Sequence, residues 1–132
     1  MKTLKFKLFP DSTITYTLRL SMHRYANNNS LAVLAECFDE DFNAYVPFCD
    51  VTVNLEETSM IPEFVGEGFA FVDENDTPGI GKTLEKAGLA SFTGIMGQSG
   101  FCAYPLYKFN MDALRECVYE NTYDDAKEGA QA

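Results

Sequence analysis

The chain has 132 residues, 46% of them hydrophobic, and a formal net charge of −10, which is enough for one domain with a real core. Its apolar runs are far shorter than the roughly 20 residues of a membrane-spanning helix, and its start lacks a signal-peptide core, so we expect a cytoplasmic protein without membrane contact. The acidity argues against nucleic acid as a direct ligand, because phosphates repel carboxylates.

The charge is distributed unevenly along the chain. Residues 1–25 carry a net charge of +4, whereas the other 107 residues carry a net charge of −14. An acidic surface attracts basic protein patches and speeds encounter with them. A basic protein surface is therefore the expected partner, and the alternative that the acidity only keeps the protein soluble stays open.

The first half of the chain predicts antiparallel strands. Hydrophobic and polar residues alternate at 4–8 and 14–22, which is the period of half-buried strands, and turn residues between these two stretches indicate a hairpin. His23 extends the polar row of the second strand and is expected at the surface. Further strands are predicted at 31–38 and 45–55, the latter bulged or split at its proline because proline cannot donate to a ladder.

A loop at 56–68 and a brief strand at 69–72 lead to the first of two predicted helices. Thr77 is the expected N-cap of this helix, with Pro78 at its first position. Gly88 stands where a residue in the left-handed conformation ends a helix.

The rest of the chain predicts strands, a second helix and a tail. Glycine turns and aromatic residues at 91–109 suit one or two strands, and Asn110 is placed to cap a second short helix. From residue 122 onward few hydrophobic residues remain. We therefore expect residues 1–121 to form a single α+β domain with a mainly antiparallel, meander-like sheet and two short helices, and residues 122–132 to form a frayed acidic tail.

The segment Asp76–Thr83 (DTPGIGKT) ends like a phosphate-binding loop. Such a loop needs glycine where this chain has Asp76, whose carboxylate repels phosphate, and Pro78 lacks one of the amide N–H groups that the loop uses. A calcium loop fails as well, because Leu84 stands where a bidentate glutamate is needed. We expect the capped start of a helix here.

No catalytic or metal-binding motif is apparent in the sequence. Cys37, Cys49, Cys102 and Cys117 are widely spaced without a C-x-x-C pair, and we expect reduced thiols. The single histidine supplies too few ligands for zinc and lies far along the chain from any cysteine. We therefore expect no catalytic residue, no metal and no cofactor, and a protein that is not an enzyme, although an enzyme of unrecognised type stays open.

Three stretches carry a resemblance to a known family. They are SLAVLAECFDEDFNAYVPFCDVTVNL at 30–55, GFAFVDENDTPGIGKTLEKAGLASFTG at 68–94 and QSGFCAYPLYKF at 98–109. In these stretches the chain resembles the domain of unknown function 4313 family, small uncharacterised proteins of gut Firmicutes and of their plasmids, conjugative elements and phages. The resemblance implies a mobile-element setting and assigns no catalytic residue.

Carboxylates gather at three predicted strand ends, where loops present side chains from a rigid sheet. These candidate partner-binding residues are Asp39, Glu40, Asp41, Glu56, Glu57, Asp73, Glu74 and Asp76. With the setting that the resemblance implies, they predict a non-enzymatic binding protein that contacts a basic host protein, as a nucleic-acid mimic or as an inhibitor of a defence system such as CRISPR or restriction.

The alternative is an accessory protein of the element, monomeric or homodimeric, whose acidity serves only solubility. If the acidic residues bind no partner, the aromatic segment around Phe101 and Tyr104 is the next candidate surface.

Overall fold

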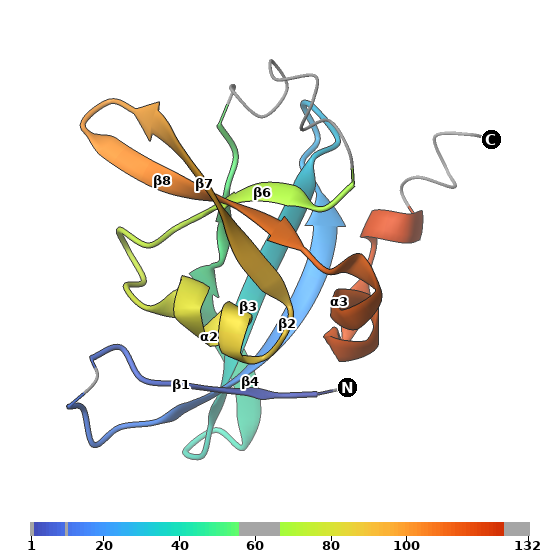
Figure 1. Ribbon diagram of the computed structural model, residues 1–132. Helices are drawn as coiled ribbons and strands as arrows, with labels where there is room; N and C mark the ends of the chain where they lie inside the picture. Colours follow the sequence, from blue (N-terminus) through green and yellow to red (C-terminus); the bar gives the residue numbers. More distant parts are fainter. Residues whose placement is uncertain (1, 10, 56–66, 126–132) are drawn as a thin grey trace.

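A computed structural model describes residues 2–9, 11–55 and 67–125, which form two sheets, the two short helices α2 and α3 and a helical turn at 123–125 (Figure 1). Strand pairing is antiparallel except between β2 and β9, so the predicted α+β fold with a mainly antiparallel sheet is confirmed. Within these ranges no helix is long and apolar enough to cross a membrane.

The first sheet is a meander in chain order, with β9 beside β2. The alternating sequence that predicted the first hairpin places Leu4 opposite Leu18, so both side chains reach the core. The strands of this sheet are β1 (Leu4–Phe6), β2 (Tyr16–Arg24), β3 (Leu31–Asp39), β4 (Ala44–Asp50) and β9 (Glu120–Asn121).

The pairing of β3 with β4 is bulged beside a proline. Ala35 opposes Cys49 and the next residue, Glu36, opposes Pro47, which leaves Phe48 as an extra residue in β4. Because proline has no amide hydrogen, the ladder breaks at this position. The bulge predicted at Pro47 is confirmed.

The second sheet has the order β5-β6-β8-β7, so β8 lies between β6 and β7. The chain enters this sheet at Val51, whose N–H donates to the Val33 carbonyl at 2.9 Å and whose carbonyl accepts from the Asp73 N–H at 2.9 Å. The strands are β5 (Thr52–Val53), β6 (Phe69–Val72), β7 (Ala90–Ser99) and β8 (Cys102–Phe109).

The main core lies where the two sheets and both helices meet. Fully burying one large hydrophobic side chain stabilises a fold by about 1.5–3 kcal/mol. The most buried members of this core, none more than 1% exposed, are Phe6, Leu18, Leu20, Met22, Val33, Val51, Val72, Ile80, Leu84, Phe109 and Leu114. A smaller cluster of Leu55, Phe71 and Leu106 is separate from it, because alternate residues of β6 and β8 point to opposite faces of their sheet.

The two helices begin differently. The side chain of Asn110 accepts the Ala113 N–H at 3.2 Å and caps α3 (Met111–Cys117), as predicted. In α2 (Ile80–Lys86) the cap residue is Gly79, which has a left-handed φ of 91° and no side-chain cap of its own. The predicted cap at Thr77 was wrong, because the carboxylate of Glu74 reaches forward and accepts the first amides of α2 instead.

Residues 122–125 belong to the folded domain, so the predicted boundary after residue 121 lies too early. Tyr123 is 5% exposed and packs into the main core, with the Arg24 guanidinium 3.7 Å from its ring centre. The Thr122 N–H donates to the Met22 carbonyl at 2.9 Å. One aromatic side chain thus anchors a segment that is polar in sequence. Residues 126–132 of the predicted tail lie outside the described residues.

Candidate functional site

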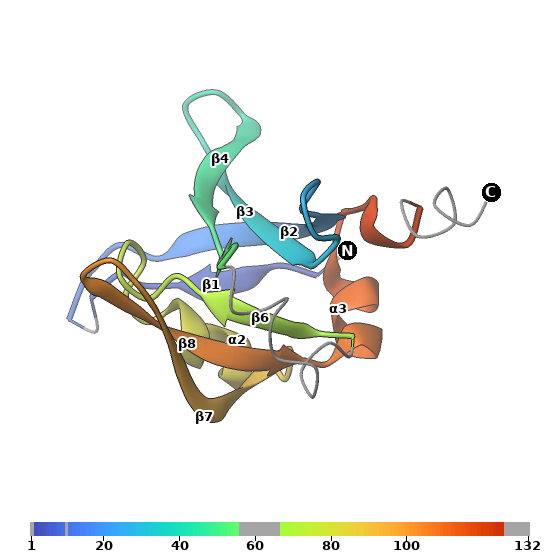
Figure 2. The same ribbon diagram turned by 90° about the horizontal axis from the view of Figure 1, so that it is seen from above.

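The β3–β4 hairpin projects from the body of the protein, and its tip carries three of the predicted site residues (Figure 2). The Asp39 carboxylate accepts the N–H of Asp41 at 2.9 Å and that of Phe42 at 3.4 Å. Asn43 completes the turn with a φ of 50°. Asp39 therefore shapes the turn, and the exposed Glu40 and Asp41 present their carboxylates to solvent.

Aromatic side chains accompany these carboxylates. Phe42 is 75% exposed at the tip, and Phe38 lies 5.3 Å from Tyr45, ring centre to ring centre, just behind it. The Arg19 guanidinium lies 4.1 Å from the Tyr45 ring centre and pairs with Glu36 at 2.8 Å. Exposed aromatic residues are typical of protein-binding surfaces. Phe42 was not predicted as a site residue, although an aromatic residue inside an acidic turn was a sequence signal that could have identified it.

The turn between β6 and α2 holds the second predicted group. The Asp73 carboxylate accepts the Asp76 N–H at 3.0 Å, and the Glu74 carboxylate accepts the N–H of Gly79 at 3.0 Å and that of Gly81. Both carboxylates therefore stabilise backbone. Asp76 is the exposed carboxylate of this turn.

The two acidic turns lie on separate projections of the molecule in both views (Figures 1 and 2). The structure therefore brings the carboxylates together within each turn and does not bring the two turns together. Glu56 and Glu57, the remaining predicted pair, lie outside the described residues. That all three groups contact one partner stays a prediction.

His23 joins β2 to the chain that follows β9. Its Nε2 lies 2.9 Å from the Ser21 hydroxyl and its Nδ1 lies 2.6 Å from the Thr122 hydroxyl. A serine bonded to a histidine is one element of nucleophilic catalysis. Here the serine is 3% exposed, so a substrate carbonyl has no access to it. The arrangement is a structural link, and Thr122 is the partner that sequence reasoning did not foresee.

Three of the four cysteines are poor candidates for nucleophiles. All four are free thiols. Burial raises the pKa of the Cys37, Cys49 and Cys117 thiols, which disfavours the reactive thiolate at neutral pH. Across the described part of the chain, no group of three or more His, Cys, Asp or Glu side chains is placed to hold a metal ion.

Tyr107 sits between the carboxylates of the α2 region. Its hydroxyl donates to the Glu85 carboxylate at 3.3 Å, and burial, together with the charges of Glu85 and Glu74, raises its pKa to about 12. The side chain is 5% exposed and stays protonated at neutral pH, so it offers no base to a substrate. It also explains Gly81, since a Cβ there would lie 2.1 Å from the Tyr107 oxygen.

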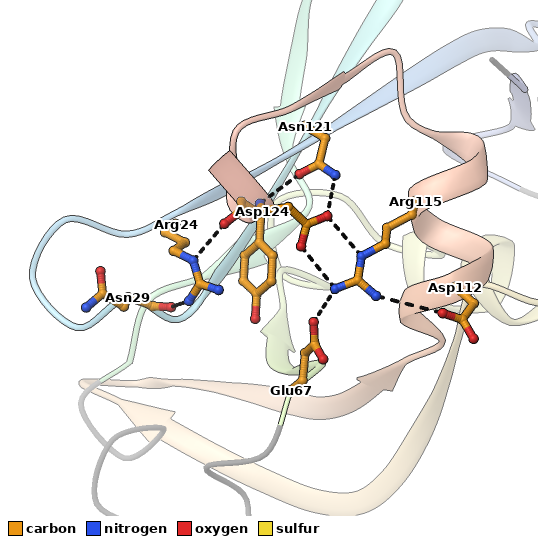
Figure 3. A network of polar contacts seen from close by, with 8 residues as sticks. Arg24, Asn29, Glu67, Asp112, Arg115, Asn121 and Asp124 are labelled. Atoms are coloured by element: carbon orange, nitrogen blue, oxygen red, sulfur yellow. Dashed lines mark hydrogen bonds and ion pairs between the residues drawn. The ribbon is translucent and has the colours of Figure 1, made fainter. Parts of the chain in front are cut away.

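Arg115 on α3 gathers three carboxylates (Figure 3). It binds Asp124 through two hydrogen bonds, of 2.9 and 3.1 Å, contacts Glu67 at the start of the β6 segment, and lies 3.8 Å from Asp112. Two parallel bonds between a guanidinium and a carboxylate fix both side chains. The network fastens the folded end of the chain to α3 and has a structural role.

Replacing Asp124 with asparagine tests this role. The hydrogen bond from Arg115 holds the pKa of Asp124 below its ordinary value. The resulting stabilisation is present above the unfolded-state pKa of about 3.9 and is lost as the pH falls through the lower folded-state value. For this partly exposed pair we expect Asp124→Asn to lower the free energy of unfolding by about 1 kcal/mol at neutral pH.

Urea unfolding at about pH 7 and about pH 3 measures this difference. The gap between wild type and Asp124→Asn should close at the lower pH. Asp125→Asn, at an exposed neighbouring position, is the matched control and should leave stability unchanged at both. A gap of equal size at both pH values would contradict the assignment.

These features define a small two-sheet α+β protein with a projecting acidic hairpin whose tip exposes an aromatic side chain. The chain belongs to the family described as Domain of unknown function (DUF4313), whose model matches residues 19–125. This confirms the resemblance found in the sequence. No curated protein and no solved structure matches the chain. The family match includes both acidic turns, whereas β1 lies before it.

Proposed function

We propose that this protein is a non-enzymatic binding protein whose β3–β4 hairpin contacts a basic protein surface. The proposal rests on the tip of this hairpin, where the exposed carboxylates of Glu40 and Asp41 adjoin Phe42, which is 75% exposed. Carboxylates steer and orient a basic partner, while a buried aromatic anchor supplies affinity. Asp39 pre-shapes the turn, which reduces the ordering cost of binding.

The family resemblance supplies the setting of the proposal, a mobile element acting on its host in the cytoplasm. The proposed target is a host protein that handles nucleic acid, such as a CRISPR or restriction effector. CRISPR effectors hold a displaced single strand in a basic groove, and grooves for single strands commonly also stack bases on aromatic side chains. An acidic hairpin ending in Phe42 offers a groove of this kind both charge and a ring. This supports partial mimicry by the hairpin.

A second candidate rests on a different observation. β7 is the last strand of its sheet and exposes Phe92 to 46% and Met96 to 53%. An edge strand of this length is a template for pairing with a second copy. On this basis the protein is a homodimeric accessory of the element, whose acidity serves solubility.

Charge reversal at the hairpin separates the two candidates. We expect Glu40→Lys/Asp41→Lys to weaken capture of the wild-type partner from host lysate by at least tenfold, about 1.4 kcal/mol, with an unchanged melting temperature. Exposed charges contribute little to folding. Any partner that the variant still captures at low salt should be lost at high salt, because exposed charge pairs are screened.

Glu116→Lys/Glu120→Lys is the matched control, since both positions are exposed and the net charge changes by the same amount. The control should retain the partner within about twofold of wild type. Equal losses in both variants would favour acidity as a general property over a hairpin contact, and no loss in either would refute the hairpin proposal.

A further inference from the structure

A groove of about 920 Å³ lies between β1 and α2, which run side by side in the lower part of Figure 1. The tip of the acidic hairpin lies elsewhere, as Figure 2 shows. Ligand pockets in proteins typically measure about 300–1,000 Å³. The volume of the groove therefore suits a small molecule, and its lining indicates which kind.

The groove is basic in an acidic protein. Four lysines line it, Lys5, Lys7, Lys82 and Lys86, against one acidic residue, Glu74. The lining thus carries a formal charge of +3 in a chain whose net charge is −10. The Glu74 carboxylate already accepts two backbone amides of the α2 start.

None of the four lysine ammonium groups forms an ion pair with a described residue. Lys5 donates to the Thr17 hydroxyl at 2.7 Å. The side chains of Lys7, Lys82 and Lys86 make no hydrogen bond or ion pair with any residue in the described ranges, and all three residues are exposed. With twice as many acidic as basic residues in the chain, carboxylate partners are plentiful, yet these lysines face the groove instead.

The four lysines come from two elements on either side of the groove. Lys5 and Lys7 are two residues apart in and just after β1, a spacing of about 6–7 Å in extended chain, and Lys82 and Lys86 are four residues apart on α2, a spacing of about 6 Å. An anion with two neighbouring charged groups suits a lining that has lysines from both elements. Lysine ammonium groups bind phosphate as point charges. Hydroxyls and apolar surface complete the lining, with Thr3, Thr15, Thr83, Leu8, Phe9 and Pro78.

We propose that this groove binds a small phosphate-bearing anion with at least two neighbouring negative groups. The lysine side chains hold it. The N-terminus of α2 does not bind the anion, because the N–H groups of Gly79 and Gly81 already donate to the Glu74 carboxylate. The site is thus distinct from the phosphate-binding loop that the sequence of Asp76–Thr83 resembles.

A small ligand fits this groove better than a nucleic acid strand. A polymer that extends past the lysines meets the rest of the surface, and residues 26–132 carry a net charge of −14. Salt screens charges over about 8–10 Å, so an anion confined to the groove is governed by the local lysines. The free anion and the phosphate end of a nucleotide share this chemistry, and the exposed ring of Phe9 offers the latter a face for its base.

Titration of the full chain with tripolyphosphate and with ATP, without added magnesium, tests the proposal by calorimetry and by amide NMR shifts. We expect binding in the range of about 10–500 μM at low salt, shifts centred on β1 and α2, and a loss of at least tenfold in Lys82→Ala/Lys86→Ala. Lys108→Ala, which removes a lysine outside the groove, should bind within about twofold of wild type.

Comparison of the probes and variants distinguishes the possible ligands. Tighter binding of ATP than of tripolyphosphate, with Phe9→Ala removing the difference, assigns a nucleotide, and equal binding assigns the phosphate groups alone. The proposal is overturned by no binding of either probe up to about 5 mM, by shifts away from β1 and α2, or by undiminished binding in Lys82→Ala/Lys86→Ala. Tighter binding of a short oligothymidylate than of tripolyphosphate would replace the small ligand with a polymer.

Discussion

Replacing Gly81 with alanine is expected to destabilise the protein by about 3 kcal/mol, the upper part of the range for overpacking a core. At an open helical position the same change would stabilise by about 1 kcal/mol. Here the added Cβ would lie 2.1 Å from the Tyr107 oxygen and 2.9 Å from a Glu74 oxygen. Because Tyr107 is buried, relief of the clash must displace α2 and disturb the Glu74 cap.

Urea unfolding of Gly81→Ala and of Lys82→Ala measures the contrast. The exposed Lys82 should change stability by less than about 0.5 kcal/mol. A Gly81→Ala protein as stable as wild type would contradict the assignment of Gly81 to packing against Tyr107. The difference in stability between the two variants would assign Gly81 of the DTPGIGKT segment a packing role. It would also show that folding does not need the Lys82 side chain, which leaves that side chain free for a ligand.

Gly97→Ala is expected to destabilise by about 2–3 kcal/mol through a second close approach. A Cβ on Gly97 would lie 2.4 and 2.6 Å from two ring carbons of Phe71. Phe71 is 1% exposed in the small cluster with Leu55 and Leu106, so its ring has little room to move. The glycine in β7 thus permits a large aromatic residue in β6.

A double-mutant cycle isolates this contact. Phe71→Leu alone should cost about 1–2 kcal/mol, and combined with Gly97→Ala it should be less destabilising than the sum of the two by at least about 1 kcal/mol. Urea unfolding of the four proteins gives the coupling energy. If the effects of the two substitutions on the free energy of unfolding are additive, the added Cβ at residue 97 does not clash with the Phe71 ring.

Local signals in the sequence predicted much of the fold. The alternation at 4–8 and 14–22, the proline at residue 47 and the cap at Asn110 each act on neighbouring residues, and each was confirmed. The errors involve contacts over longer separations. Glu74 replaces Thr77 as the cap of α2 from seven residues before Gly81, and Tyr123 reaches a core built from much earlier strands.

The candidate site divides in the same way. The acidic turns were found because each is a run of neighbouring carboxylates after a strand. Their arrangement on separate projections depends on how the strands pack, which no local pattern encodes. The lysine groove was missed for the same reason, because Lys7 and Lys82 lie 75 residues apart in the chain and line one groove only through the packing of the β1 segment beside α2.

Hydrogen–deuterium exchange of the protein alone and in complex with its captured partner tests the hairpin proposal most directly. The proposal predicts slowed amide exchange at residues 38–45, around Phe42, with the β7–β8 hairpin unchanged. Phe101 at the tip of that hairpin is fully exposed and is the rival surface. Slowed exchange around Phe101 with no change at residues 38–45 would contradict the proposed contact.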